Sequence, residues 1–137
     1  MRALVDSSVL IAAARPRESL HATAADALQM HAAGGIGVPA TILGETMSFL
    51  GARVGVDAQR SFWDAFLRSG IEIIQADIEL LEIAREIDRR YSDAKFGFAD
   101  CTLLAACERV RCARILSFDC RLASYRPTFA PAIELLP

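Results

Sequence analysis

The chain has 137 residues, 53% of them hydrophobic, and 17 acidic against 15 basic side chains leave a net charge of −2 at pH 7. This length is typical of one domain, so we expect residues 1–137 to form a single domain. The charge does not by itself indicate nucleic-acid binding, and no run approaches the ~18 apolar residues of a membrane helix. We expect a cytoplasmic protein, and the apolar excess favours a homodimer.

Short apolar runs alternate along the chain with segments of helical pattern, separated by Pro, Gly and capping residues. In chain order, we expect a strand at 3–6, helices at 7–15 and 19–33, a strand at 36–39, helices at 41–53 and 58–69, a strand at 71–75, helices at 78–91 and 99–110, and strands at 113–119 and 132–136. Strands that alternate with helices predict an α/β fold, with a parallel sheet covered by helices on both faces.

Four acidic residues fall at the ends of these predicted elements. Asp6 and Asp119 close predicted strands, and Glu45 and Asp100 lie in the first turns of predicted helices. In such a fold, the carboxyl ends of the strands and the amino ends of the following helices share the edge of the sheet where ligands bind. We therefore expect all four carboxylates at that one edge.

Each of these acids alone has an ordinary structural explanation, such as a turn or a helix-dipole interaction of about 0.3–1 kcal/mol. Together they are harder to explain, because two carboxylates ~4 Å apart repel by about 4 kcal/mol at an effective dielectric constant of 20. A hard divalent cation such as Mg²⁺ relieves this repulsion and prefers oxygen ligands. The pattern therefore predicts a metal site.

The segments that carry these acids resemble the PIN domain family, and in particular the small VapC-type toxins of bacterial toxin–antitoxin pairs. The segments are LVDSSVLIAAA, VPATILGE, FADCTLLAACERV and ARILSFD. The resemblance implies a three-layer α/β/α sandwich around a parallel sheet of four or five strands. It also implies an endoribonuclease that depends on Mg²⁺ or Mn²⁺, and a cognate antitoxin as partner. The implied metal ligands are Asp6, Glu45, Asp100 and Asp119.

The expected chemistry is attack on RNA by a metal-activated water, in which the four acids hold the ion. Phosphate contacts then have to come from arginine, since Lys95 is the only lysine. The candidate substrate-binding residues are Ser7, Arg15, Arg17 and Arg121. Asp93 also matches a common position of the family, but its loop fits a surface or capping role equally well.

Two other functions compete with the nuclease. A phosphatase with an aspartyl nucleophile also places Asp at the end of its first strand, but it needs a second acid two residues on, where this chain has Ser8. The other alternative is a non-catalytic PIN-like module that binds metal weakly and serves to bind a partner. Substitution of Asp6 or Asp100 separates these functions, because only the nuclease loses RNA cleavage.

Overall fold

A five-stranded parallel sheet in the order β3-β2-β1-β4-β5 forms the centre of the computed structural model, which describes residues 1–137. The strands are β1 (Ala3–Val5), β2 (Ile36–Pro39), β3 (Glu72–Ile74), β4 (Arg114–Leu116) and β5 (Glu134–Leu136). Every neighbouring pair is parallel. The predicted α/β/α fold class with four or five parallel strands is confirmed.

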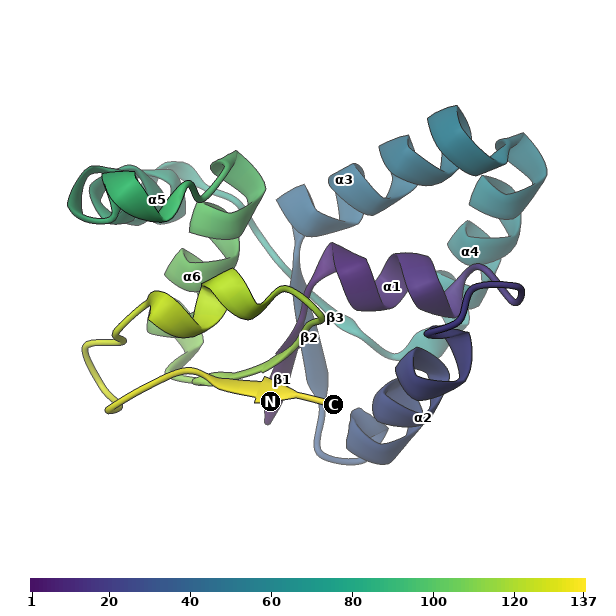
Figure 1. The fold of residues 1–137 in the computed structure, drawn as a ribbon, viewed down its shortest axis with the longest axis horizontal. Coiled ribbons are helices and arrows are strands. Elements are labelled where there is room, and N and C mark those ends of the chain that lie inside the picture. The colour runs from purple at the N-terminus through teal and green to yellow at the C-terminus, as the bar shows by residue number, and fades with distance from the viewer.

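Six α-helices connect the strands, as parallel pairing requires. They are α1 (Ser7–Ala13), α2 (His21–Ala32), α3 (Ala40–Phe49), α4 (Val56–Ser69), α5 (Ile78–Arg90) and α6 (Phe98–Val110). Helices α5 and α6 pack against each other on one side of the sheet, and α1 packs against α2 on the other (Figure 1). None of the helices combines the length and the apolar character needed to cross a membrane.

The two elements that carry Asp6 and Asp100 belong to the most buried part of the core. All three residues of β1 are fully buried, as expected for a central strand covered on both faces. In α6, every residue from Cys101 to Cys107 is buried, which makes it a core helix rather than an amphipathic surface helix. The burial of β1 and α6 therefore fixes the position of the acids at their ends.

Two predicted element boundaries are wrong in ways that move the acids. Helix α3 begins at Ala40, and the strand residue Pro39, whose backbone is still extended, is its N-cap. Glu45 consequently lies in the second turn of α3, not in the first. Strand β4 ends at Leu116, so Asp119 lies three residues beyond the strand and caps a short 3-10 helix, Cys120–Ser124.

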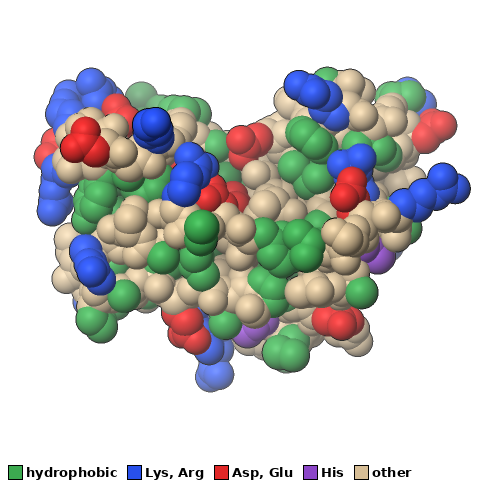
Figure 2. Space-filling view, in the orientation of Figure 1, with side chains coloured by type: hydrophobic (Ala, Val, Ile, Leu, Met, Phe, Trp, Pro, Cys, Tyr) green, Lys and Arg blue, Asp and Glu red, His purple; other side chains and the backbone are tan.

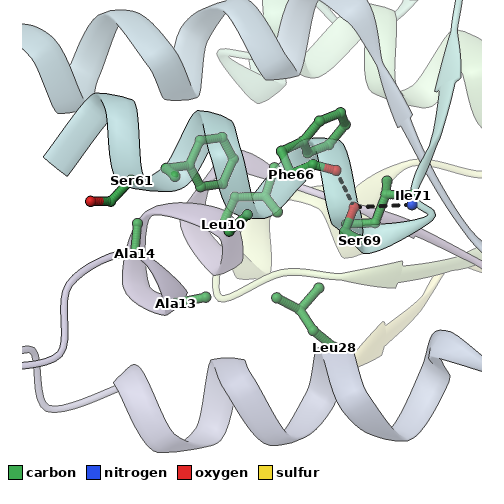
Figure 3. A pocket seen from close by; sticks show the side chains of 10 residues that line it. Leu10, Ala13, Ala14, Leu28, Ser61, Phe66, Ser69 and Ile71 are labelled. Carbon is green, nitrogen blue, oxygen red and sulfur yellow. Dashed lines mark hydrogen bonds between the residues drawn. The ribbon is translucent and has the colours of Figure 1, made fainter. Parts of the chain in front are cut away.

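An apolar pocket lies between α1, α2 and α4 (Figure 3). Leu10 and Leu28 face Phe66 across it, and at its end the Ser69 hydroxyl donates to the Phe66 carbonyl over 2.7 Å. None of the predicted metal ligands lines this pocket. The candidate active site is therefore a different region of the molecule.

Candidate active site

Asp6 joins strand β1 to helix α1 and is only 4% exposed. Its Oδ1 atom accepts a hydrogen bond from the Ser7 backbone N–H over 2.8 Å, which caps α1. Its Oδ2 atom accepts hydrogen bonds from the hydroxyls of Ser8, over 3.0 Å, and Ser117, over 2.7 Å. These three donors satisfy a carboxylate that is otherwise costly to bury and hold it in one orientation.

Ser117 and Ser8 also connect Asp6 to the segment that carries Asp119. The Ser117 oxygen accepts a hydrogen bond from the Asp119 backbone N–H over 2.9 Å, and the Ser8 oxygen accepts one from the Phe118 N–H over 3.1 Å. Sequence reasoning missed Ser117 as a site residue. The available signal was a hydroxyl two residues before an acid, at the end of a buried strand. Ser117 is therefore a positioning residue for both acids.

Arg121 forms a bidentate ion pair with Asp119. Its Nε donates to Asp119 Oδ1 over 3.0 Å and its Nη2 donates to Asp119 Oδ2 over 2.5 Å. The same Nη2 lies 3.3 Å from Asp100 Oδ2, and Nη1 donates to the Lys95 carbonyl over 2.9 Å. The Arg121 hydrogen bonds hold the pKa of Asp119 below its ordinary value, and Asp119 in turn raises the pKa of Arg121.

Asp100 lies in the first turn of α6, as predicted, and its Oδ2 accepts a hydrogen bond from the Gly97 N–H over 3.1 Å. Its side chain is 16% exposed. Burial raises the pKa of Asp100, and the negative charges of Asp6 and Asp119 add to this effect, against the opposing influence of Gly97 N–H and Arg121. The ionised form of Asp100 is therefore disfavoured, and a bound cation would stabilise it.

Glu45 approaches the same acids from helix α3, which contacts α6. Partial desolvation raises the pKa of Glu45, a hydrogen bond from the Ser7 side chain opposes this, and the charges of Asp6 and Asp100 raise it further. A hydrogen bond of 2.6 Å between the hydroxyls of Thr41 and Thr102 joins the two helices. Glu45 thus lies in the electric field of Asp6 and Asp100, although it comes from a different turn than predicted.

At the predicted edge of the sheet, Asp100 interacts electrostatically with each of the other three acids. Figure 2 shows the surface hollowed between the α5 side and the α3–α4 side, with acidic side chains on the floor of the hollow beside a basic one. However, no three Asp, Glu, His or Cys side chains lie close enough together to hold a metal ion. Carboxylate oxygens are the donors that Mg²⁺ and Mn²⁺ prefer. The chemical type of the donors therefore suits such an ion, although their spacing in this structure is too wide for three of them to bind it, and Arg121 is paired to two of them.

The other predicted substrate-binding arginines lie elsewhere. Arg15 and Arg17 follow the C-terminal end of the seven-residue helix α1, whereas Asp6 precedes its N-terminal end. The Arg15 guanidinium pairs with Glu18 over 2.7 Å and lies 6.0 Å from the centre of the Phe49 ring. Of the predicted arginines, only Arg121 touches the acids. Asp93 is exposed in a short 3-10 helix, Ser92–Ala94.

The opposite pKa shifts of Asp100 and Asp119 predict opposite effects on stability. A carboxyl group with a raised pKa in the folded state makes a contribution to stability that falls as the pH rises through that pKa. In a chelator, we expect Asp100→Asn to raise the melting temperature at pH 7, and the difference to vanish once acidic pH protonates Asp100.

Asp119→Asn should lower the melting temperature at pH 7, because ionised Asp119 is stabilised by Arg121, and this difference should be lost as the pH falls through its lowered pKa. Melting curves followed by circular dichroism from acidic to neutral pH measure both effects. Shifts of the same sign for the two variants would contradict these assignments.

Comparison with known proteins identifies the family. A family model described as PIN domain matches residues 3–126. Ribonuclease VapC26 of Mycobacterium tuberculosis is 25% identical over 135 residues, which cover 98% of this chain and 99% of that protein.

Solved structures share the fold. The structure of Mycobacterium tuberculosis VapC20, described as a sarcin–ricin loop cleaving toxin, superposes with a TM-score of 0.78 at 24% identity, over 86% of this chain and 90% of that one. VapBC2 from Rickettsia felis, bound to a promoter DNA fragment, has a TM-score of 0.69 at 14% identity, over 87% and 88% of the two chains. FitAcB from Neisseria gonorrhoeae has a TM-score of 0.68 at 14% identity, over 98% and 96%. With its acids at the expected edge, its fold shared with these proteins and a family match over most of its length, the chain belongs to the PIN domain family.

Proposed function

We propose that the protein is a divalent-metal-dependent endoribonuclease and the VapC-type toxin of a toxin–antitoxin pair. The observation that carries this proposal is the approach of four carboxylates from four separate segments to one edge of the sheet, where two of them have raised pKa values. The similarity to ribonuclease VapC26 over nearly the whole of both chains supports the same activity. The cytoplasm, where RNA is available, is the expected location.

In this proposal, Asp6, Glu45, Asp100 and Asp119 hold Mg²⁺ or Mn²⁺. The bound cation supplies a polarised water and neutralises charge on the phosphoryl oxygens during hydrolysis. The contribution of the protein is rigid placement of the ligands. Asp6 is locked by two hydroxyls and a backbone N–H, and Asp100 is held by a core helix.

For substrate binding, Arg121 is the arginine that borders the acids, and the Ser7 hydroxyl lies beside Glu45. Arg15 and Arg17 remain candidates for contacts farther along an RNA strand, since they lie past the other end of α1. RNA is longer than the acidic hollow, and its backbone carries a negative charge at each nucleotide. Arg121 would therefore contact one phosphate, and Arg15 and Arg17 would contact other phosphates of the same strand.

The proposed partners are a cognate antitoxin and a second copy of the chain. Similarity to the VapBC2 structure supports the antitoxin. The homodimer is supported by large apolar side chains left exposed on α4 and β3, where Trp63 is 53% exposed, Leu67 72% and Ile73 48%. Exposed apolar surface of this kind commonly marks a protein–protein interface.

The non-catalytic module remains the second candidate for two reasons. No three of the acidic side chains lie close enough together to hold a metal ion in this structure, and Arg121 is paired to two of them. The phosphatase gains no support, because Ser8 stands where a second acid is needed and hydrogen-bonds to Asp6. The nuclease and the module differ in one measurable property, which is metal-dependent cleavage of RNA.

The test is cleavage of total bacterial RNA by the purified protein, with new 5′ ends mapped by sequencing. We expect no cleavage in excess chelator and recovery when Mg²⁺ or Mn²⁺ is added, because water activation depends on the cation. Asp100→Asn, purified in parallel, measures contaminating ribonuclease. Cleavage that persists in chelator would rule out the mechanism, and metal binding without cleavage above the variant background would establish the module instead.

A further inference from the structure

Arg121 makes contacts that the proposed cation also needs. Its guanidinium occupies both oxygens of Asp119 and one oxygen of Asp100. Asp119 and Asp100 are two of the four proposed metal ligands. A carboxylate oxygen engaged by a guanidinium N–H is not free to coordinate a cation in the same direction. Guanidinium and metal are therefore competitors for the same atoms.

The structure holds Arg121 in this position from two further directions. The Arg121 backbone N–H donates to Asp119 Oδ1 over 3.0 Å, as part of the cap of the 3-10 helix Cys120–Ser124. Nη1 donates to the Lys95 carbonyl, at a residue with a left-handed backbone conformation, φ 59°. The contact with the acids is thus a built arrangement of three segments rather than a chance approach of a surface side chain.

Release of Arg121 nevertheless requires little disruption. Its side chain is 49% exposed, and Asp119 keeps its capping bond to the Arg121 backbone when the guanidinium leaves. A half-exposed ion pair contributes modestly to stability. After release, the guanidinium stays tethered two residues from Asp119, at the border of the acidic hollow. A fork of N–H donors in that position suits a phosphate group.

We propose that Arg121 is an internal counter-ion that occupies two of the acids in the metal-free protein, is displaced when the divalent cation binds, and then contacts an RNA phosphate. This inference rests on the proposed function, because it requires a cation at these acids. It explains why no three of the acidic side chains lie close enough together to hold a metal ion in the structure. It also makes Arg121 a determinant of metal affinity as well as a substrate contact.

The experiment compares Mn²⁺ binding to the wild-type protein, Arg121→Gln, Arg121→Lys and Arg126→Gln by electron paramagnetic resonance. Arg126 is the matched control, because its substitution removes the same charge but its guanidinium contacts only the Pro131 carbonyl. Removal of the competitor should tighten Mn²⁺ binding about three- to tenfold in Arg121→Gln, the range for a partly exposed bidentate ion pair. The Mn²⁺ affinity of Arg121→Lys should lie between those of the wild type and Arg121→Gln, since an ammonium group lacks the planar fork of N–H donors. The Mn²⁺ affinity of Arg126→Gln should match that of the wild type.

Two further measurements test the exchange itself. The Nε–H resonance of Arg121, assigned by its absence in Arg121→Gln, should shift on titration of the wild-type protein with Mg²⁺. RNA cleavage by Arg121→Gln should fall even though its metal binding tightens, because the phosphate contact is lost.

Binding of Mn²⁺ by the wild type that is equal to or tighter than that by Arg121→Gln would overturn the inference and leave the proposed function intact. An unshifted Nε–H resonance at saturating Mg²⁺ would also overturn it. Cleavage by Arg121→Gln as fast as the wild type would refute the phosphate contact. Failure of every variant to bind Mn²⁺ would instead remove the proposed function, and the inference with it.

Discussion

Asp100→Asn is expected to reduce RNA cleavage by about a hundredfold or more while the protein keeps its fold. The substitution removes the charge of a proposed metal ligand, and a metal ion stabilises the transition state by several kcal/mol, each 1.36 kcal/mol being a factor of ten in rate. The fold should persist because the amide oxygen of Asn can still accept the bond from Gly97 N–H. Cleavage rates at saturating Mg²⁺, together with circular dichroism spectra, measure both properties.

Asp26→Asn provides the matched control for this variant. Asp26 is an exposed residue of α2, a helix that carries none of the four acids, and its substitution is the same chemical change. The Asp26→Asn variant should cleave RNA at the wild-type rate. If Asp100→Asn retained the rate of this control, Asp100 would not be a metal ligand and the proposed mechanism would be wrong.

Asp6→Ala is expected to lower the free energy of unfolding by about 2–4 kcal/mol, the combined effect of losing a helix cap and removing the acceptor of two serine hydroxyls, one of which is buried. Asp6 accepts the capping bond of α1 and the hydrogen bonds of two serines, and it is 4% exposed. Urea denaturation of the metal-free protein measures the change. A loss well below 1 kcal/mol would show that the hydrogen-bond network at Asp6 contributes little to stability.

Asp6→Asn keeps the shape of the side chain and an acceptor for the Ser7 N–H. It should therefore be more stable than Asp6→Ala while also losing cleavage, because the amide lacks the charge that a cation requires. This difference matters for testing function. Loss of activity in Asp6→Ala alone could come from unfolding, whereas loss in Asp6→Asn or Asp100→Asn reports on the chemistry.

The sheet and the helices could be predicted from local pattern because each strand is short, apolar and bounded by breakers. Segment 36–39 is an example, since the predicted strand and β2 coincide. The start of α5 was also predictable, because Asp77 caps it through the Leu80 N–H as its sequence context indicates. The errors occurred at element ends such as Pro39, where the last strand residue is also the N-cap of helix α3.

The candidate site was predictable to the level of which acids share an edge. That inference needed only the direction of parallel strands and the helices that follow them. It did not reveal Ser117, whose hydroxyl joins Asp6 to the Asp119 backbone. Nor did it distinguish Arg121, which touches the acids, from Arg15, which pairs with Glu18 beyond the other end of α1.

The amino-acid sequence by itself determined the parallel α/β architecture and the edge of the sheet that the four acids share, because hydrophobic periodicity and chain direction are local properties. Only the tertiary structure decided which oxygens of those carboxylates are engaged, and by which partners. Ser117 and Asp6 are 111 residues apart in the chain, and Arg121 reaches Asp100 across 21 residues. Contacts of this kind depend on the pairing of β4 with β1 and on the packing of α6 against β2 and α3, which no spacing within a single segment encodes.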